Sequence, residues 1–193
     1  MHTSRGKARI QKRTSKMAQN AGKIFESDFK KSVPSYVLVH RLNDAAQSFG
    51  GNGKLRFSCK NPFDFMLWDS KRHILYALEL KTVKDKSISF EREENEKQKK
   101  EIHWHQIQGL NKWNEYDGVS AGFVIEFREI ETTVFIHIKD FNSLIAGIDK
   151  KSFSYSDLVN SGLPYFIIPQ EKKITRYTYN IEEFLERKGE ANE

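Results

Sequence analysis

Residues 61–82 have the sequence NPFDFMLWDSKRHILYALELKT, and this stretch decides the fold. Two runs rich in apolar and aromatic residues, Phe63 to Trp68 and Ile74 to Lys81, are separated by a polar, turn-forming segment, which predicts two strands joined as a hairpin. Because successive side chains of a strand point to opposite faces, Glu79 and Lys81 share one face. The second strand therefore presents a carboxylate and an ammonium group side by side.

A second carboxylate, that of Asp64, lies on the neighbouring strand of this hairpin. Two carboxylates at one end of a sheet provide the hard oxygen ligands that Mg²⁺ prefers, with further positions for water and phosphate. A metal bound there polarises phosphoryl oxygens and lowers the pKa of a bound water, while Lys81 orients that water and offsets charge in the transition state. The pattern predicts a phosphodiester-cleaving site that takes Mg²⁺, with Mn²⁺ as a substitute.

The Glu-x-Lys triplet is a weak signal by itself, because the chain repeats it at 171–173 and, as Glu-Arg-Lys, at 186–188. Only the triplet at 79–81 ends an apolar strand-like run and follows a Pro-x-Asp segment at a hairpin's distance. The competing interpretation is a half-exposed strand with an ordinary salt bridge.

The remaining pattern predicts an α/β fold, in which a central mixed sheet of about five strands is flanked by helices. The active site is expected on the exposed face of its second and third strands. Residues 84–100 are intensely charged and are expected to form a solvated, mobile loop. The other predicted elements are helices at 21–32, 101–116, 140–147, 154–161 and from 181, and strands at 36–39, 122–127 and 134–138.

The positive charge is concentrated at the start of the chain. Net charge is +6, and residues 1–23 contain seven cations and no acid. We predict a basic, mobile arm over residues 1–20 and a single nuclease domain over 21–193. The arm either binds DNA phosphates through counterion release or is a solvated tail. The predicted DNA contacts are Arg5, Lys7, Arg9, Lys12, Arg13, Lys16 and, in a glycine-bearing loop, Lys54.

Composition restricts the other classes of function. A single cysteine, Cys59, removes intrachain disulfides and Cys-rich zinc sites. An apolar stretch of the roughly 18 residues that span a bilayer is absent from the sequence, so a cytoplasmic protein without membrane partners is expected. His103 and His105 are assigned to a helix start or to DNA proximity, and Trp104 and Trp113 to the core.

Two further segments, Gly22-Lys23-Ile24-Phe25-Glu26 and Ile102-His103-Trp104-His105-Gln106-Ile107, accompany the Pro-x-Asp and Glu-x-Lys pair. Together these pieces resemble the PD-(D/E)xK nuclease superfamily, and more narrowly the RecU family of Holliday junction resolvases of Gram-positive bacteria and their phages. The resemblance extends over about residues 21–140.

This resemblance implies a role for each matching residue. Asp64 and Glu79 would be metal ligands, Lys81 the catalytic lysine, Gln106 a further metal or water-shell contact, and Glu26 a supporting acid. It also implies a homodimer whose two sites cut opposite strands of a four-way DNA junction, a substrate that two-fold symmetry suits. A recombinase or helicase partner is left open.

The chain departs from the family at two points. Pro62 stands where the family commonly has threonine, and the loop at about 43–61, which in the family projects into the junction, is shorter. Two alternatives therefore stay open. One is a related nuclease acting on duplex, flap or single-stranded DNA, and the other is a catalytically silent DNA-binding or scaffolding protein.

Overall fold

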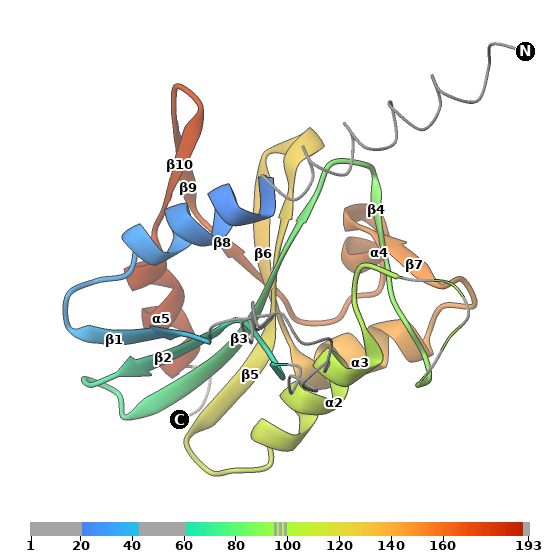
Figure 1. Ribbon diagram of the computed structural model, residues 1–193, viewed down its shortest axis with the longest axis horizontal. Helices are drawn as coiled ribbons and strands as arrows, with labels where there is room; N and C mark the ends of the chain where they lie inside the picture. The colour runs from blue at the N-terminus through green and yellow to red at the C-terminus, as the bar shows by residue number, and fades with distance from the viewer. Residues whose placement is uncertain (1–20, 43–60, 95, 97, 99, 191–193) are drawn as a thin grey trace, which may run out of the picture.

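The computed structural model describes residues 21–42, 61–94, 96, 98 and 100–190, with side chains described up to residue 187. A six-stranded mixed sheet forms its centre, in the strand order β1-β2-β3-β5-β6-β8 (Figure 1). Its strands are β1 (Val37–Arg41), β2 (Phe65–Asp69), β3 (Ile74–Val83), β5 (Val119–Phe127), β6 (Thr132–His137) and β8 (Phe166–Ile168). The α/β prediction is confirmed, with one strand more than expected.

The predicted hairpin is present. Strand β2 pairs antiparallel with β3, so that Phe65 lies opposite Leu78. Strand β3 then pairs parallel with β5, and the crossover between them contains helix α2 (Trp104–Trp113). The other neighbouring pairs in this sheet are antiparallel. The Glu79–Lys81 triplet thus lies on a central strand.

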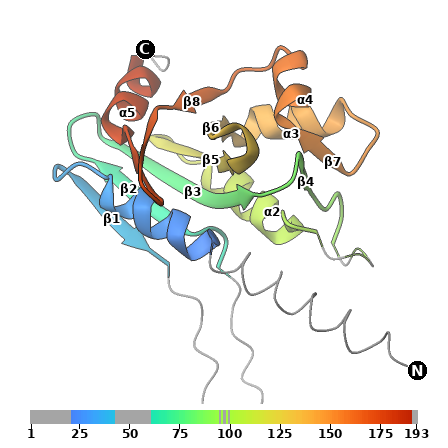
Figure 2. The same ribbon diagram turned by 90° about the horizontal axis from the view of Figure 1, so that it is seen from above.

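Helices cover both faces of the sheet (Figure 2). The first helix occupies residues 21–31. The others, besides α2, are α3 (Ile138–Ala146), α4 (Tyr155–Asn160) and α5 (Ile181–Glu190), and a short 3₁₀ turn, η1, covers Arg128–Ile130. The start of α5 is capped by Asn180, because the Glu183 backbone N–H donates to Asn180 Oδ1 at 3.1 Å. Within the described residues, none of these helices is long and apolar enough to cross a bilayer.

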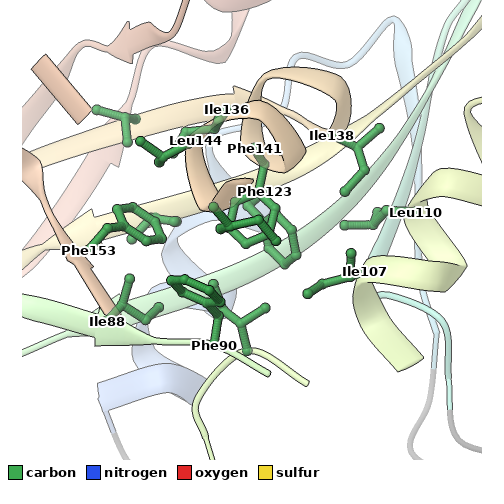
Figure 3. Close-up of a cluster of buried hydrophobic side chains, with 14 of the residues drawn as sticks. Ile88, Phe90, Ile107, Leu110, Phe123, Ile136, Ile138, Phe141, Leu144 and Phe153 are labelled. Atoms are coloured by element: carbon green, nitrogen blue, oxygen red, sulfur yellow. The ribbon is translucent and has the colours of Figure 1, made fainter. Parts of the chain in front are cut away.

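Side-chain alternation along β3 supplies two separate cores. Tyr76, Leu78 and Leu80 pack beneath the first helix and α5, together with Phe29 and Phe184. The opposite face contributes Ala77 and Val83 to a second cluster under α2 and α3, which Figure 3 shows around Phe123 and Phe141. A strand covered on both faces is expected to be apolar throughout. Charged residues inside it therefore require a specific explanation.

The charged segment at 84–100 differs from the solvated loop predicted for it. Ile88 is 1% exposed and Phe90 is fully buried. Strand β4 (Ser87–Ser89) pairs with β7 (Ser152–Ser154), and Phe90 bridges Ile102. Ile88 and Phe90, two positions apart, face the same side of a strand, and this is enough to anchor a short one. The surrounding charged residues hid this alternation in the sequence.

A second small sheet is a hairpin made of β9 (Gln170–Lys173) and β10 (Arg176–Tyr179). It rises clear of the body beside the first helix (Figure 1). Its two-residue loop, Ile174-Thr175, contains none of the glycine, asparagine or aspartate that usually marks a hairpin turn, so this hairpin was not predicted from the sequence.

Candidate active site

Glu79 and Lys81 form the centre of the site. The Lys81 ammonium lies 3.0 Å from Glu79 Oε1, and both side chains point to the α2 face of β3. The predicted shared face is confirmed, but the expectation of an exposed face is wrong. Glu79 is 3% exposed because α2 covers it, while 17% of the Lys81 side chain is accessible. The ion pair is therefore buried at Glu79 and reaches solvent at Lys81.

Asp64 lies next to this pair, immediately before β2. Its backbone N–H donates to Leu78 O at 3.1 Å, and its Oδ2 accepts from the Leu80 N–H at 2.8 Å. These two bonds fix the carboxylate against the residues on either side of Glu79. Burial raises the pKa of Asp64 to about 6, although the Leu80 hydrogen bond and Lys81 act in the opposite direction.

Burial also raises the pKa of Glu79 to about 8, and the negative charges of Asp64 and Glu26 add to that rise. Lys81 lowers the pKa by its charge and its hydrogen bond. Two carboxylates thus share one poorly hydrated place with a single ammonium group. A like charge nearby disfavours ionisation of each carboxyl, and an added cation favours it.

Gln106 connects α2 to Glu79. Its amide nitrogen donates to Glu79 Oε1, and its amide oxygen accepts from the His103 backbone N–H at 2.9 Å. Because the oxygen faces a backbone donor, the nitrogen must face the carboxylate. In this arrangement Gln106 holds Glu79 in place by donating to it.

A close approach between α2 and the segment before β2 makes that contact possible. A Cβ atom at Gly109 would lie 2.6 Å from Pro62 Cβ and 2.8 Å from Pro62 O. Such distances exclude a side chain at position 109. Gly109 therefore lets α2 pack closely against Pro62. This close packing brings Gln106 within reach of Glu79 on β3.

Glu26 reaches the site from the first helix. Its Oε2 lies 2.7 Å from Arg41 Nε, at the end of β1. Its charge contributes to the raised pKa of both Asp64 and Glu79, while Arg41 lowers the pKa of Asp64. Glu26 is close enough to act electrostatically on the carboxylates of Asp64 and Glu79, and its own charge is balanced by Arg41.

The donor set fits a magnesium ion. Among the described residues, no three or more His, Cys, Asp or Glu side chains gather around one point as a metal cage. Asp64 and Glu79 supply hard oxygen ligands, and Mg²⁺ is usually bound through one or two carboxylates plus water and phosphate. A divalent cation between them would also favour their ionised forms, which burial disfavours.

The start of α2 holds a contact that the sequence did not reveal. Glu91 Oε2 accepts from the Trp104 N–H at 2.7 Å, and Glu91 Oε1 lies 2.9 Å from His103 Nδ1. His103 is the N-cap and is extended, so its ring stacks on that of His105 with centroids 5.5 Å apart. The assignment of His103 to a helix start is confirmed. The two side chains can meet although they are two residues apart, because only His105 is helical.

The predicted DNA contacts Arg5, Lys7, Arg9, Lys12, Arg13, Lys16 and Lys54 lie outside the described residues. Trp113 packs edge-on against Phe63 with ring centroids 5.1 Å apart, and Trp104 packs against the same cluster, which confirms their place in the core. A cavity of about 1010 Å³ lies elsewhere, between the β2–β3 turn and the end of α2, and Asp64, Glu79 and Lys81 are not among its lining residues.

Comparison with known proteins finds similarity both in sequence and in structure. The chain is 32% identical over 173 residues, 84% of its length, to the SPbeta prophage-derived uncharacterized protein YotM of Bacillus subtilis, of which the match covers 83%. A solved structure of Hjc from Archaeoglobus fulgidus, a Holliday junction resolvase, matches with a TM-score of 0.38 and 12% identity, covering 65% of this chain and 80% of that one. The sequence matches no protein-family model.

Proposed function

The chain belongs to the family of the prophage protein YotM, and we propose that it is a magnesium-dependent DNA endonuclease. The observation that carries the proposal is the cluster of the buried Glu79 with the half-buried Asp64 and Lys81, in which Lys81 Nζ lies 3.0 Å from Glu79 Oε1. Taking two carboxylates out of water is costly unless they are paired or bind a metal. Such a cluster on a central strand supports a catalytic role better than a structural one.

Each residue has a defined part in hydrolysis. Asp64 and Glu79 would hold the metal, which when bound polarises the phosphodiester and acidifies a water molecule. Lys81 reaches solvent from beside Glu79, so its ammonium can orient the attacking water and offset negative charge on the phosphate. Gln106 keeps the Glu79 carboxylate in its rotamer. Mn²⁺, which accepts the same oxygen ligands, is expected to replace Mg²⁺.

The proposed substrate is a branched DNA, the four-way junction. The sequence resemblance to RecU resolvases supports it, and a homodimer would place two such sites to nick opposite strands. The basic residues 1–20 and Lys54 would add phosphate contacts. A recombinase or helicase would be the source of the junction and is a candidate partner.

The decisive test is cleavage of a labelled four-way junction beside a linear duplex of the same sequence, with Mg²⁺ or with chelator. We expect paired symmetric nicks in the junction that require Mg²⁺. Lys81→Ala should abolish them while retaining DNA binding. Lys84→Ala is the matched control, because Lys84 follows β3 closely, is exposed and lies outside the cluster.

The other outcomes separate the alternatives. Equal cutting of both substrates would retain the nuclease and reject junction selectivity in favour of a duplex, flap or single-strand nuclease. Pro62 is the observation that favours this second candidate, since it packs against Gly109 and supplies no hydroxyl group to the site. Binding without cutting at any Mg²⁺ or Mn²⁺ concentration would indicate the silent DNA-binding protein.

A further inference from the structure

The tip of the β9–β10 hairpin carries Ile174, the most exposed large apolar side chain among the described residues. Ile174 is 94% exposed, and the loop consists of only Ile174 and Thr175, since Lys173 pairs with Arg176. Figure 1 shows the hairpin projecting beyond the rest of the fold. Burial of an isoleucine side chain is favourable, so an isoleucine held in water at the end of a projection is suited to a contact outside the chain.

The backbone at Ile174 is strained. Its φ is +58°, in the left-handed region that β-branched residues rarely adopt. A two-residue loop with positive φ at its first position is the pattern of a type II′ turn, where glycine is the usual residue. Isoleucine therefore makes the turn less stable than glycine would. Strained residues of this kind cluster at ligand-binding positions.

The two strands of the hairpin are anchored to the body close to the loop. Arg176 Nε lies 2.7 and 2.9 Å from the two oxygens of Asp28 on the first helix. The Tyr177 N–H also donates to Asp28, at 3.2 Å, and Lys172 pairs with Glu131. These bonds hold both strands next to the loop, so the tip is presented by a fixed support.

The position and charge of the hairpin suit DNA. Glu131 follows η1 in the turn between β5 and β6, and Val83 at the end of β3 pairs with Phe127 at the end of β5. The hairpin thus lies near the end of the sheet at which β3 terminates, two residues beyond Lys81. Three cations, Lys172, Lys173 and Arg176, and one acid, Glu171, give it a charge of +2. Lys172 and Arg176 pair with Glu131 and Asp28, so Lys173, outside these pairs, is the cation suited to a phosphate contact.

We propose that Ile174 is a wedge that enters DNA at an unstacked base step, and that this step is the branch point of the junction. The inference rests on the proposed function and adds a residue that selects the substrate. Apolar wedges that enter DNA between base steps must unstack them, which costs least where stacking is already broken. On linear duplex the wedge has to break stacking itself, so Ile174 favours branched over linear DNA.

The test places 2-aminopurine, whose fluorescence rises on unstacking, beside the branch point of a junction, in chelator so that the DNA stays intact. Wild type should raise the fluorescence, whereas Ile174→Gly should not. The preference for junction over duplex should fall about tenfold, the effect of losing the burial of one such side chain. Ile174→Gly should also unfold at higher denaturant concentration than wild type, because glycine tolerates the positive φ.

Two variants serve as controls. Val159→Ala shortens another exposed apolar residue, 45% exposed on α4, and should leave the fluorescence and the preference unchanged. Lys173→Ala should retain the unstacking signal and lower the slope of log affinity against log salt by about 0.9, the contribution of one phosphate contact.

Failure of the wedge and failure of the nuclease give different results. A wild type that cuts junctions with Mg²⁺ but leaves 2-aminopurine stacked overturns the wedge alone. An unstacking signal and a preference that survive Ile174→Gly also overturn it, and they would point to a protein contact at the tip. Unstacking that depends on Ile174, without cleavage under any metal, supports the wedge and overturns the nuclease.

Discussion

Two buried glutamates on neighbouring strands have different surroundings. Glu79 on β3 is 3% exposed and Glu126 on β5 is 5% exposed. Glu79 shares its place with Asp64 and Lys81, and its pKa is raised to about 8. Glu126 accepts hydrogen bonds from two neutral hydroxyls, those of Thr82 at 2.5 Å and Tyr179 at 3.1 Å.

The difference shows that burial of a carboxylate does not by itself identify an active site. Hydroxyl donors satisfy Glu126 within the fold, so it joins β3, β5 and β10 as a structural residue. Glu79 has as neighbours a second carboxylate, that of Asp64, and a cation that reaches solvent, Lys81. A bound metal ion would complete this arrangement. Thr82 belongs to the structural site although it follows Lys81 directly, because strand alternation turns it to the opposite face.

The largest effect that tests this contrast is expected from Glu79→Gln. Activity with Mg²⁺ should fall by about a thousandfold, the scale of losing a preorganised charge at the reacting phosphate. Stability in chelator should not fall, because the change removes a carboxyl whose charged form is costly to bury. Single-turnover junction cleavage and urea unfolding measure the two quantities. A variant that unfolds readily would make Glu79 a structural residue like Glu126.

The second effect is a pH dependence of stability in the metal-free protein. The unfolded chain releases the Glu79 proton near the ordinary pKa of 4.5, whereas the folded protein keeps it until about 8. Between these values the folded state binds more protons, so the free energy of unfolding falls as pH rises. Asp64, with its pKa raised to about 6, contributes in the same direction at lower pH.

Urea unfolding at about pH 5, 7 and 9 in chelator measures this decline. Glu79→Gln should flatten the part above pH 6, and Mg²⁺ should restore stability at high pH by binding the ionised carboxylates. Glu126→Gln is the control and should retain the decline. An equal pH dependence in wild type and Glu79→Gln would contradict the assignment of the raised pKa to Glu79.

A third and smaller effect concerns the structural glutamate. Glu126→Ala should cost about 1–3 kcal/mol in the free energy of unfolding, because it leaves the Thr82 and Tyr179 hydroxyls buried without their acceptor. Glu126→Gln should recover most of the loss, since a hydroxyl can also accept from the new amide. Cleavage by both folded variants should match wild type. A selective loss of activity in Glu126→Gln would erase the distinction between the two sites.

The sequence predicted those parts of the candidate site that depend on residues close together in one hairpin. The two-residue period placed Glu79 with Lys81, and the hairpin brought Asp64 beside them. It did not predict that α2 would bury Glu79, because that depends on a close approach at Gly109, and a glycine inside a helical pattern does not identify its partner. Glu126 was also missed, since its acceptor role depends on Tyr179, 53 residues further along the chain.

The smallest effect tests how the Glu79 site is held from a distance. Glu91 accepts from the Trp104 N–H at 2.7 Å, and the His103 N–H in turn donates to the Gln106 oxygen, whose amide nitrogen contacts Glu79. Glu91→Gln removes a negative charge from the helix N-terminus, a loss of about 0.3–1 kcal/mol.

We therefore expect Glu91→Gln to lower kcat a few-fold while KM for the junction stays unchanged, because the contacts of Glu91 are with the start of α2. Glu101→Gln is the matched control, since Glu101 accepts from the Ser89 N–H and hydroxyl, each at 2.7 Å, and lies outside the chain of contacts that leads to Glu79. Equal kcat values in the two variants would show that Gln106 keeps its place without Glu91. A fall in Glu91→Gln alone would extend the contrast between the two glutamates, because only Glu79 would then depend on a carboxylate outside its own contacts.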